Sequence, residues 1–193
     1  MPFKPADFTQ VNHTMNRALV SRAIRLLEVK ATDRVLDLFC GIGNFTLALA
    51  RRAKQVMGIE GLASLTRRAQ ENALHNGLTD KVRFLQSDLF LVNPETITAW
   101  GKAERWLMDP PREGAMEICK ALAELNAQSS QLLPERIVYV SCNPKTLARD
   151  AQILCHQAGY VLSAAGIVNM FPHTSHVESM AVFDRIETKN ELR

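Results

Sequence analysis

Glycine, acidic and thiol residues stand at the ends of the apolar segments in this 193-residue sequence. A turn with Gly41 follows the first segment, and Glu60, Asp88 and Asp109 end the next three. Cys142 ends the fifth. Carboxylates accept hydrogen bonds from hydroxyl and amino groups, and a thiolate is a nucleophile. Ligands of an open parallel sheet bind beyond the carboxyl ends of its strands. If the segments are parallel strands, these residues therefore form one candidate site.

The turn after the first segment reads DLFCGIGN and contains Gly41 and Gly43. Two glycines let the backbone turn tightly and approach a ligand closely, although a purely structural turn is the alternative. The dinucleotide-binding fingerprint has a third glycine, but Thr46 stands at that place here. This difference argues against a bound pyrophosphate. Asp37, just before the glycines, would repel a phosphate and suits an amino group.

Two of the strand-end acids suit a nucleoside. A carboxylate at Glu60 can accept hydrogen bonds from both hydroxyls of a ribose. Asp88 can accept one from an adenine amino group. The structural alternatives are a strand-end acid facing solvent for Glu60 and a turn acid for Asp88. With the glycine turn, these residues describe a pocket for a nucleoside that carries a cationic amino-acid tail, and S-adenosylmethionine fits that description.

Two further strand ends carry candidates for substrate chemistry. Asp109 precedes two prolines, which give a rigid exit and favour a substrate contact over an ordinary turn. Cys142 precedes Asn143 and Pro144, a preferred N-cap and first helical residue. The positive end of the helix dipole beside the thiol predicts a lowered pKa and a nucleophile. A packed strand-end cysteine is the alternative, and Cys40 is the rival thiol.

A loop near the carboxyl end is dense in ionisable residues, because FPHTSHVES contains His173, His176 and Glu178. The spacing does not match a strong metal-binding motif, and ordinary surface polarity is an alternative. Glu178 adjoins a strand that can return it to the candidate site, which indicates a role in proton transfer. His173 is a candidate substrate contact from the same loop.

Alternating strand and helix patterns must position these residues. A helix is expected from an N-cap at Ser64 to Asn76-Gly77, and others around Leu19–Leu27, Ile118–Leu125 and Leu147–Leu154. Strand–helix alternation indicates an α/β fold with a parallel sheet, and the last two strands form an antiparallel hairpin. The expected strands are 34–39, 55–60, 82–87, 105–108, 136–141, 160–170 and 179–186.

Composition limits the class of protein. The apolar fraction of 47% supports a folded core, and no apolar run is long enough to span a membrane. MPFKPADFTQ lacks the apolar core of a secretory signal, so a cytoplasmic location is expected. The net charge is +3, and residues 1–97 carry 13 basic and 9 acidic groups. We expect one domain over 1–193, with a leading helical segment (1–30) and a core sheet (31–187).

Cysteine spacing argues against a metal centre. None of the four cysteines forms a C-x-x-C pair, and none lies at zinc-finger spacing from histidines. Disulfides are not expected in a cytoplasmic protein. Cys119 and Cys155 lie on helix patterns and are expected in the core.

Five longer strings resemble RNA 5-methyluridine methyltransferases, and look most similar to the bacterial 23S rRNA (uracil-5-)-methyltransferases. They are FTQVN, DLFCGIGNFTLALA, DPPREGA, VYVSCNPKTLARD and MFPHTSHVESM. The resemblance implies the seven-strand, Rossmann-like fold of S-adenosylmethionine-dependent methyltransferases. It implies Cys142 as nucleophile, Glu178 as base and Phe8 near a flipped target base. It also implies cofactor contacts from Gln10, Phe39, Asn44, Glu60, Asp88 and Asp109.

The implied reaction is transfer of a methyl group from S-adenosylmethionine to C5 of a uridine in ribosomal RNA, through a cysteine–C6 adduct. The expected partner is ribosomal RNA with the target uridine flipped out. Neither a membrane nor a metal is expected, and the chain is expected to be a monomer. Members of this family usually carry an N-terminal oligonucleotide-binding barrel and cluster cysteines, so the sequence resembles a catalytic half alone. The alternatives are an RNA module without turnover, a cytosine-C5 methyltransferase and, last, a nicotinamide dehydrogenase.

Overall fold

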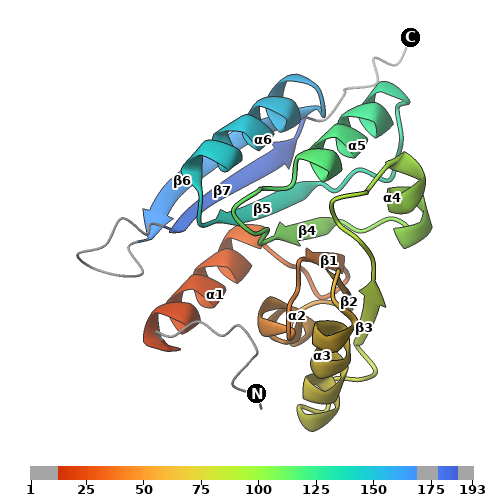
Figure 1. Ribbon diagram of the computed structural model, residues 1–193, viewed down its shortest axis with the longest axis vertical. Helices are drawn as coiled ribbons and strands as arrows, with labels where there is room; N and C mark the ends of the chain where they lie inside the picture. The colour runs from red at the N-terminus through yellow and green to blue at the C-terminus, as the bar shows by residue number, and fades with distance from the viewer. Residues whose placement is uncertain (1–12, 169–177, 187–193) are drawn as a thin grey trace.

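The computed structural model describes residues 13–168 and 178–186, and within these ranges strands and helices alternate up to β5 (Figure 1). The six helices of the described residues are α1 (His13–Leu27), α2 (Asn44–Ala50), α3 (Ala63–His75), α4 (Pro94–Trp100), α5 (Met116–Ala127) and α6 (Pro144–His156). The seven strands of the same residues are β1 (Arg34–Leu38), β2 (Gln55–Glu60), β3 (Val82–Gln86), β4 (Arg105–Met108), β5 (Arg136–Ser141), β6 (Tyr160–Val168) and β7 (Glu178–Arg185).

The strands form one seven-stranded sheet in the order β3-β2-β1-β4-β5-β7-β6. Strands β1 to β5 pair in parallel. β7 runs antiparallel to both of its neighbours, β5 and β6. The expected plan of five parallel strands and a closing antiparallel hairpin is therefore confirmed. The strand order reverses between β1 and β4, and open α/β sheets bind their ligands beyond the carboxyl ends of the strands at such a point.

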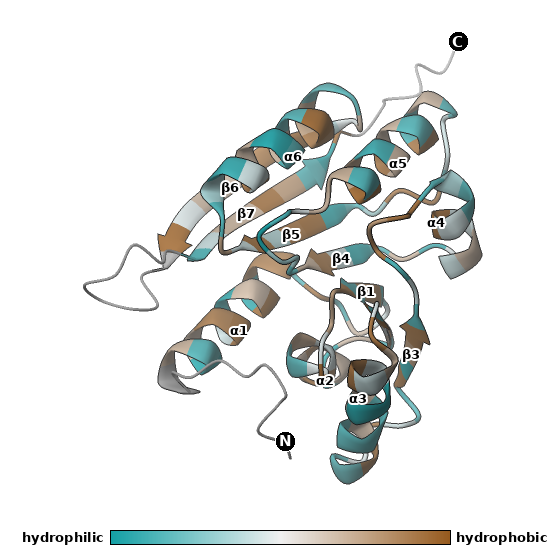
Figure 2. Cartoon of the chain, viewed as in Figure 1, coloured by the Kyte–Doolittle hydropathy of each residue, from teal (hydrophilic) through white to brown (hydrophobic). Residues whose placement is uncertain are grey.

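Helices cover both faces of the sheet, and each face has its own apolar core. Side chains of α4, α5 and α6 pack with Leu36 and Leu38 of β1 on one face. Those of α1, α2 and α3 pack with Val35 on the other face. This alternation within β1 is the period of two that a strand imposes. Figure 2 shows hydrophobic residues on the central strands and hydrophilic ones over much of the outer side of α3 and α6. In the described residues, no helix is both long and apolar enough to cross a bilayer.

Local signals predicted one helix start and one helix end correctly, and one helix start wrongly. α3 ends at His75 with Asn76 at its C-cap, as expected. Asn143 caps α6 as expected, because its side chain accepts a hydrogen bond from the Lys145 N–H at 3.1 Å. The expected N-cap at Ser64 is wrong, since α3 begins at Ala63 with Leu62 at the cap. Leu62 accepts two backbone N–H groups through its carbonyl, and this pairing replaces a side-chain cap. The seven-residue helices α2 and α4 were not among the expected elements.

Candidate active site

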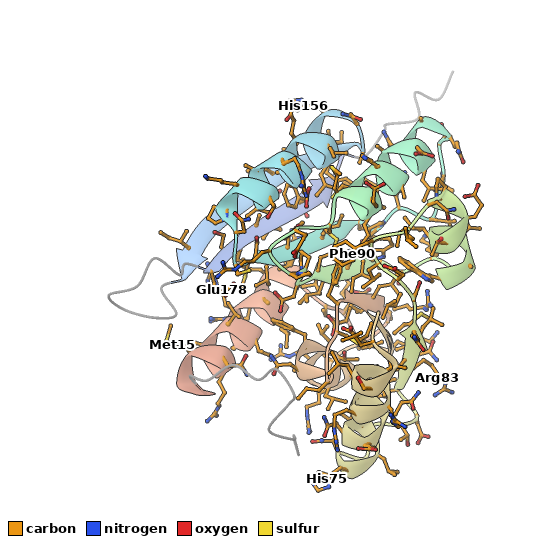
Figure 3. All side chains as sticks on the ribbon, viewed as in Figure 1. Met15, His75, Arg83, Phe90, His156 and Glu178 are labelled. Carbon is orange, nitrogen blue, oxygen red and sulfur yellow. The ribbon has the colours of Figure 1, made fainter. Side chains whose placement is uncertain are left out.

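Three reactive side chains lie at the edge of the sheet where β4 and β5 end. Asp109 directly follows β4, and Cys142 directly follows β5. Because β7 runs antiparallel to β5, its first residue, Glu178, lies at the same edge. The pairing of Ser141 with Ser179 places Cys142 and Glu178 next to each other across the two strands. All three side chains are half-buried, and Figure 3 marks Glu178 at this end of β7.

These groups act on one another electrostatically. Burial raises the pKa of Asp109 to about 8, and the charges of Glu178 and Asp37 add to this rise. Burial also raises the pKa of Cys142, as do Glu178 and Asp109, whereas the guanidinium of Arg112 lowers it. The predicted lowering of the Cys142 pKa is therefore wrong in direction. The positive end of α6 is present, but burial and two neighbouring carboxylates outweigh it.

The rival thiol, Cys40, is in a different environment. Its side chain is only 5% exposed. Burial raises its pKa well above the ordinary value, and Asp37 and Glu60 raise it further. Cys142 is half-buried at the start of a helix, so it is the more accessible of the two thiols. Cys119 is buried as expected, Cys155 is half-buried, and all four thiols are free.

The glycine turn is held by the acid at the end of β2. Glu60 accepts hydrogen bonds from the backbone N–H of Gly41 at 3.0 Å and of Leu62 at 3.1 Å. Gly41 and Gly43 have φ values of 55° and 91°, which L-residues with side chains rarely adopt. A Cβ added at Gly41 would meet nothing within 4 Å. The predicted turn is confirmed, and its backbone faces open space beside Glu60.

A second acid lies beneath this turn. Asp37 in β1 is fully buried, and the Thr46 hydroxyl donates to its Oδ2 at 2.5 Å. Its Oδ1 has no hydrogen-bond partner among the described residues. Burial raises the pKa of Asp37 to about 7, with a further rise from Glu60. Thr46, at the place of the missing third glycine, thus supports the buried acid.

Asn44 is the first residue of α2 and pairs with Asn16 of α1. Each amide donates to the other, at 3.0 Å from Asn44 and 3.2 Å from Asn16. Similarly, the Asn72 side chain of α3 donates to the Ile42 carbonyl at 3.0 Å and supports the turn from the other side. Sequence analysis missed both Asn16 and Asn72, because their partners lie 28 and 30 residues away and no local pattern marks such contacts.

The end of β3 contributes an exposed acid and an aromatic side chain. Asp88 accepts a hydrogen bond from the Phe90 N–H at 2.9 Å and is exposed to solvent. The rings of Phe90 and Phe39 lie 5.8 Å apart, and the Phe90 side chain, labelled in Figure 3, is 45% exposed. Phe39 has a φ of 62°, a strained value for a residue with a side chain. The two rings contact each other, and Phe39 comes two residues before Gly41 while Phe90 comes two residues after Asp88.

Three predicted site residues, Phe8, Gln10 and His173, lie outside the described residues. Within 13–168 and 178–186, no group of three histidine, cysteine or acidic residues lies close enough to hold a metal ion. The remaining predicted site residues all lie at the carboxyl edge of the sheet, or at the start of β7 beside it. The structure thus brings together a glycine turn, four acids and one accessible thiol.

Comparisons with known proteins agree with this arrangement. A curated relative, 23S rRNA (uracil(1939)-C(5))-methyltransferase RlmD of Polynucleobacter necessarius subsp. necessarius (strain STIR1), is 81% identical over 96% of this chain and 39% of its own length. RlmD of Cupriavidus pinatubonensis (strain JMP 134 / LMG 1197) is 64% identical over 96% of this chain and 40% of its own. The chain therefore spans about two fifths of the length of these relatives.

A solved structure extends the similarity to the fold. The Pyrococcus abyssi tRNA (uracil-54, C5)-methyltransferase, in complex with S-adenosyl-L-homocysteine, superposes with a TM-score of 0.76 at 30% identity. The match covers 94% of this chain and 41% of that chain. The family model described as tRNA (Uracil-5-)-methyltransferase matches residues 3–89 and 98–186. With nearly the whole sequence matched, the chain belongs to the tRNA (uracil-5-)-methyltransferase family.

Proposed function

We propose that this chain transfers a methyl group from S-adenosylmethionine to C5 of a uracil in 23S ribosomal RNA, with Cys142 as nucleophile and Glu178 as base. The observation that carries the proposal is the placement of Cys142 beside Glu178 across β5 and β7, at the same edge as the glycine turn. RlmD relatives act on 23S rRNA by name, and they support the choice of substrate.

The part of the site around Gly41, Asp37 and Glu60 fits a nucleoside with a cationic tail. The open space above Gly41 leaves room for a ligand against the backbone. The unpartnered Oδ1 of Asp37 and the carboxylate of Glu60 suit an ammonium and a sulfonium, and Asp109 adds a hydrogen-bond acceptor. Glu60 would accept from the ribose hydroxyls and Asp88 from the adenine amino group. Phe39, Gly43 and Asn44 would shape the pocket, and Gln10 would add a further contact.

Addition of a thiolate to C6 makes uracil C5 reactive. Cys142 makes this addition, and Glu178 acts after the methyl transfer. The Cys142 thiolate bonds to C6, and the C5=C6 electron pair moves toward the C4 oxygen. That electron pair would return through C5 to take the methyl group of a bound S-adenosylmethionine, whose methyl–sulfur bond would break to leave S-adenosylhomocysteine. Glu178 then removes the C5 proton, the double bond re-forms, and the C6–S bond breaks to return the thiolate. Arg112 and the positive end of α6 favour the thiolate against burial.

Asp109 is suited to hold the uracil during these steps. With a pKa of about 8, its carboxyl group is mostly protonated at pH 7. A neutral carboxyl group donates one hydrogen bond and accepts another, so it can pair with a carbonyl edge of uracil. Phe8 and His173 are the further substrate contacts that we propose. Flipping the base out of its stack costs a few kcal/mol, which such contacts would offset.

RNA that contains 5-fluorouridine tests the nucleophile, because fluorine cannot leave C5 as a proton. Wild-type protein with S-adenosylmethionine and a 23S rRNA fragment should form a covalent complex that survives denaturing electrophoresis. Cys142→Ala should form none, while Cys155→Ala, a variant at the other half-buried thiol, should form as much as wild type. Equal behaviour of wild type and Cys142→Ala would show that the proposed mechanism is wrong.

Replacing Glu60 by alanine should weaken cofactor binding. The change removes the acceptor for the ribose hydroxyls and for two backbone N–H groups of the turn. We expect a loss of about 1–3 kcal/mol, which corresponds to a Kd roughly 5- to 150-fold higher. Calorimetric titration with S-adenosylmethionine measures this loss. Glu71→Ala on the exposed side of α3 is the matched control, and an unchanged Kd for Glu60→Ala would remove Glu60 from the site.

A further inference from the structure

Asp150 of α6 is an acid whose side chain is completely buried (0% exposed). A buried carboxylate destabilises a fold unless it is paired and hydrogen-bonded. Both oxygens of Asp150 meet this condition. Oδ2 accepts from the Tyr139 hydroxyl and from the N–H of Ala115, both at 2.7 Å. Oδ1 accepts from Arg149, with its Nε at 2.8 Å and its Nη2 at 2.7 Å. Ala115 is the last residue of the β4–α5 loop (109–115), so one carboxylate joins β5, α6 and this loop.

Neighbours of Asp150 in α6 hold the same loop at two carbonyl groups. The Arg112 carbonyl accepts from the Asn143 amide at 3.0 Å and from the Thr146 hydroxyl at 3.1 Å. The Glu113 carbonyl accepts from Arg149 at 2.8 Å. The β4–α5 loop is thus fixed along its backbone to the first turns of the helix that directly follows the candidate nucleophile.

The loop packs closely against side chains of α6 at Gly114. Gly114 has a φ of 81°, and a Cβ added there would lie 2.6 Å from Asp150 Oδ2 and 2.7 Å from Arg149 Nη2. Contacts under 3.0 Å require movement of one partner. The loop backbone therefore rests directly on the buried carboxylate.

We propose that Asp150 is a positioning residue, which sets the place of Asp109 and Arg112 relative to Cys142. The loop carries Asp109 and Arg112, and Cys142 stands between β5 and α6. Asp150 is bonded to all three segments, through Ala115 of the loop, Tyr139 of β5 and its own helix. This inference rests on the proposed function in that it takes Cys142 as the nucleophile.

The charges around Cys142 show what a displaced loop would change. Three charged groups act on the thiol, namely Glu178 of β7 and Asp109 and Arg112 of the loop. Arg112 is the one of these three that lowers the pKa of Cys142. A loosened loop would move both Arg112 and Asp109 away from the thiol. Because Arg112 lowers the pKa of Cys142 by more than Asp109 raises it, the pKa should show a net rise and the thiolate should become harder to form.

Alkylation of Cys142 by iodoacetamide tests this inference, because the thiolate is the reacting form. The rate is measured against pH by mass spectrometry of the peptide that contains Cys142. In Asp150→Asn we expect the midpoint of the profile to rise by about 0.5 pH unit. Asp33→Asn is the matched control, since Asp33 is a buried, hydrogen-bonded acid at the opposite end of the sheet. Its midpoint should equal that of wild type.

A second variant keeps the test decisive if Asp150→Asn does not fold. Thr146→Val removes one of the two donors to the Arg112 carbonyl at a half-buried position. Its midpoint should rise in the same direction by a smaller amount. An unmoved midpoint in the folded variants would show that Asp150 only stabilises the fold. Alkylation needs neither RNA nor a methyl donor, so this result is independent of whether the fluorouridine adduct forms.

Discussion

Glu178→Gln should convert the reaction into one that stops at a covalent, methylated RNA adduct. The amide cannot take the C5 proton, so this proton leaves only slowly and the C6–S bond to Cys142 breaks only slowly. General bases contribute about 10²–10⁴-fold to rate, and turnover should fall by that factor. Gel electrophoresis under denaturing conditions, with unmodified RNA, should show an adduct that accumulates over time.

The same substitution should make it easier for Cys142 to form its bond to C6. Glu178 raises the pKa of the Cys142 thiol, so removal of its charge should lower that pKa. Adduct formation in Glu178→Gln should therefore begin at a lower pH than formation of the fluorouridine complex in wild type. The double variant Glu178→Gln/Cys142→Ala is the control and should form no adduct. Wild-type turnover in Glu178→Gln, or slow turnover without an adduct, would assign the base to another residue.

Most of the fold could be predicted, because its signals are local. The strands are short β-branched runs between helix patterns, and βαβ alternation leaves few arrangements other than a parallel sheet. Adjacent residues mark two of the helix ends: Asn143-Pro144 starts α6, and Asn76-Gly77 ends α3. The short helices α2 and α4 span seven residues each and show too little periodicity to be found in this way.

The electrostatics of the site could not be predicted in the same way. The helix start at Asn143 was visible, and it favours a lowered thiol pKa at Cys142. The opposing groups are Glu178 at the start of β7 and Asp109 just after β4. Their distances from the thiol depend on how β7 and β4 pair with β5. The buried contact between Asp150 and Ala115 spans 35 residues and has no sequence signature either. Residue types at strand ends thus indicate a site, whereas the direction of their pKa shifts can be derived only from the folded structure.

Asp37→Asn should make the free energy of unfolding less dependent on pH. The folded-state pKa of Asp37 is raised from 3.8 to about 7 by burial. The unfolded chain therefore releases its proton at a lower pH than the folded chain, and stability is lost as pH rises from about 4 to about 7. Each unit of this shift corresponds to about 1.4 kcal/mol. Asparagine does not titrate, so the variant should gain about 2–3 kcal/mol over wild type between pH 5 and pH 8.

Denaturant unfolding at pH 5 and at pH 8 measures the difference in stability between Asp37→Asn and wild type. Asp80→Asn, at an exposed position, is the control. The comparison between pH values cancels any constant effect of placing an amide beside Thr46. A difference that does not change with pH would show that Asp37 stays ionised or protonated throughout. S-adenosylmethionine should bind the variant more weakly, because we propose that this buried carboxylate attracts its cationic groups. Asp37 would then destabilise the ligand-free protein at neutral pH and yet strengthen the binding of S-adenosylmethionine. Such a combination would indicate that this acid serves binding and not stability.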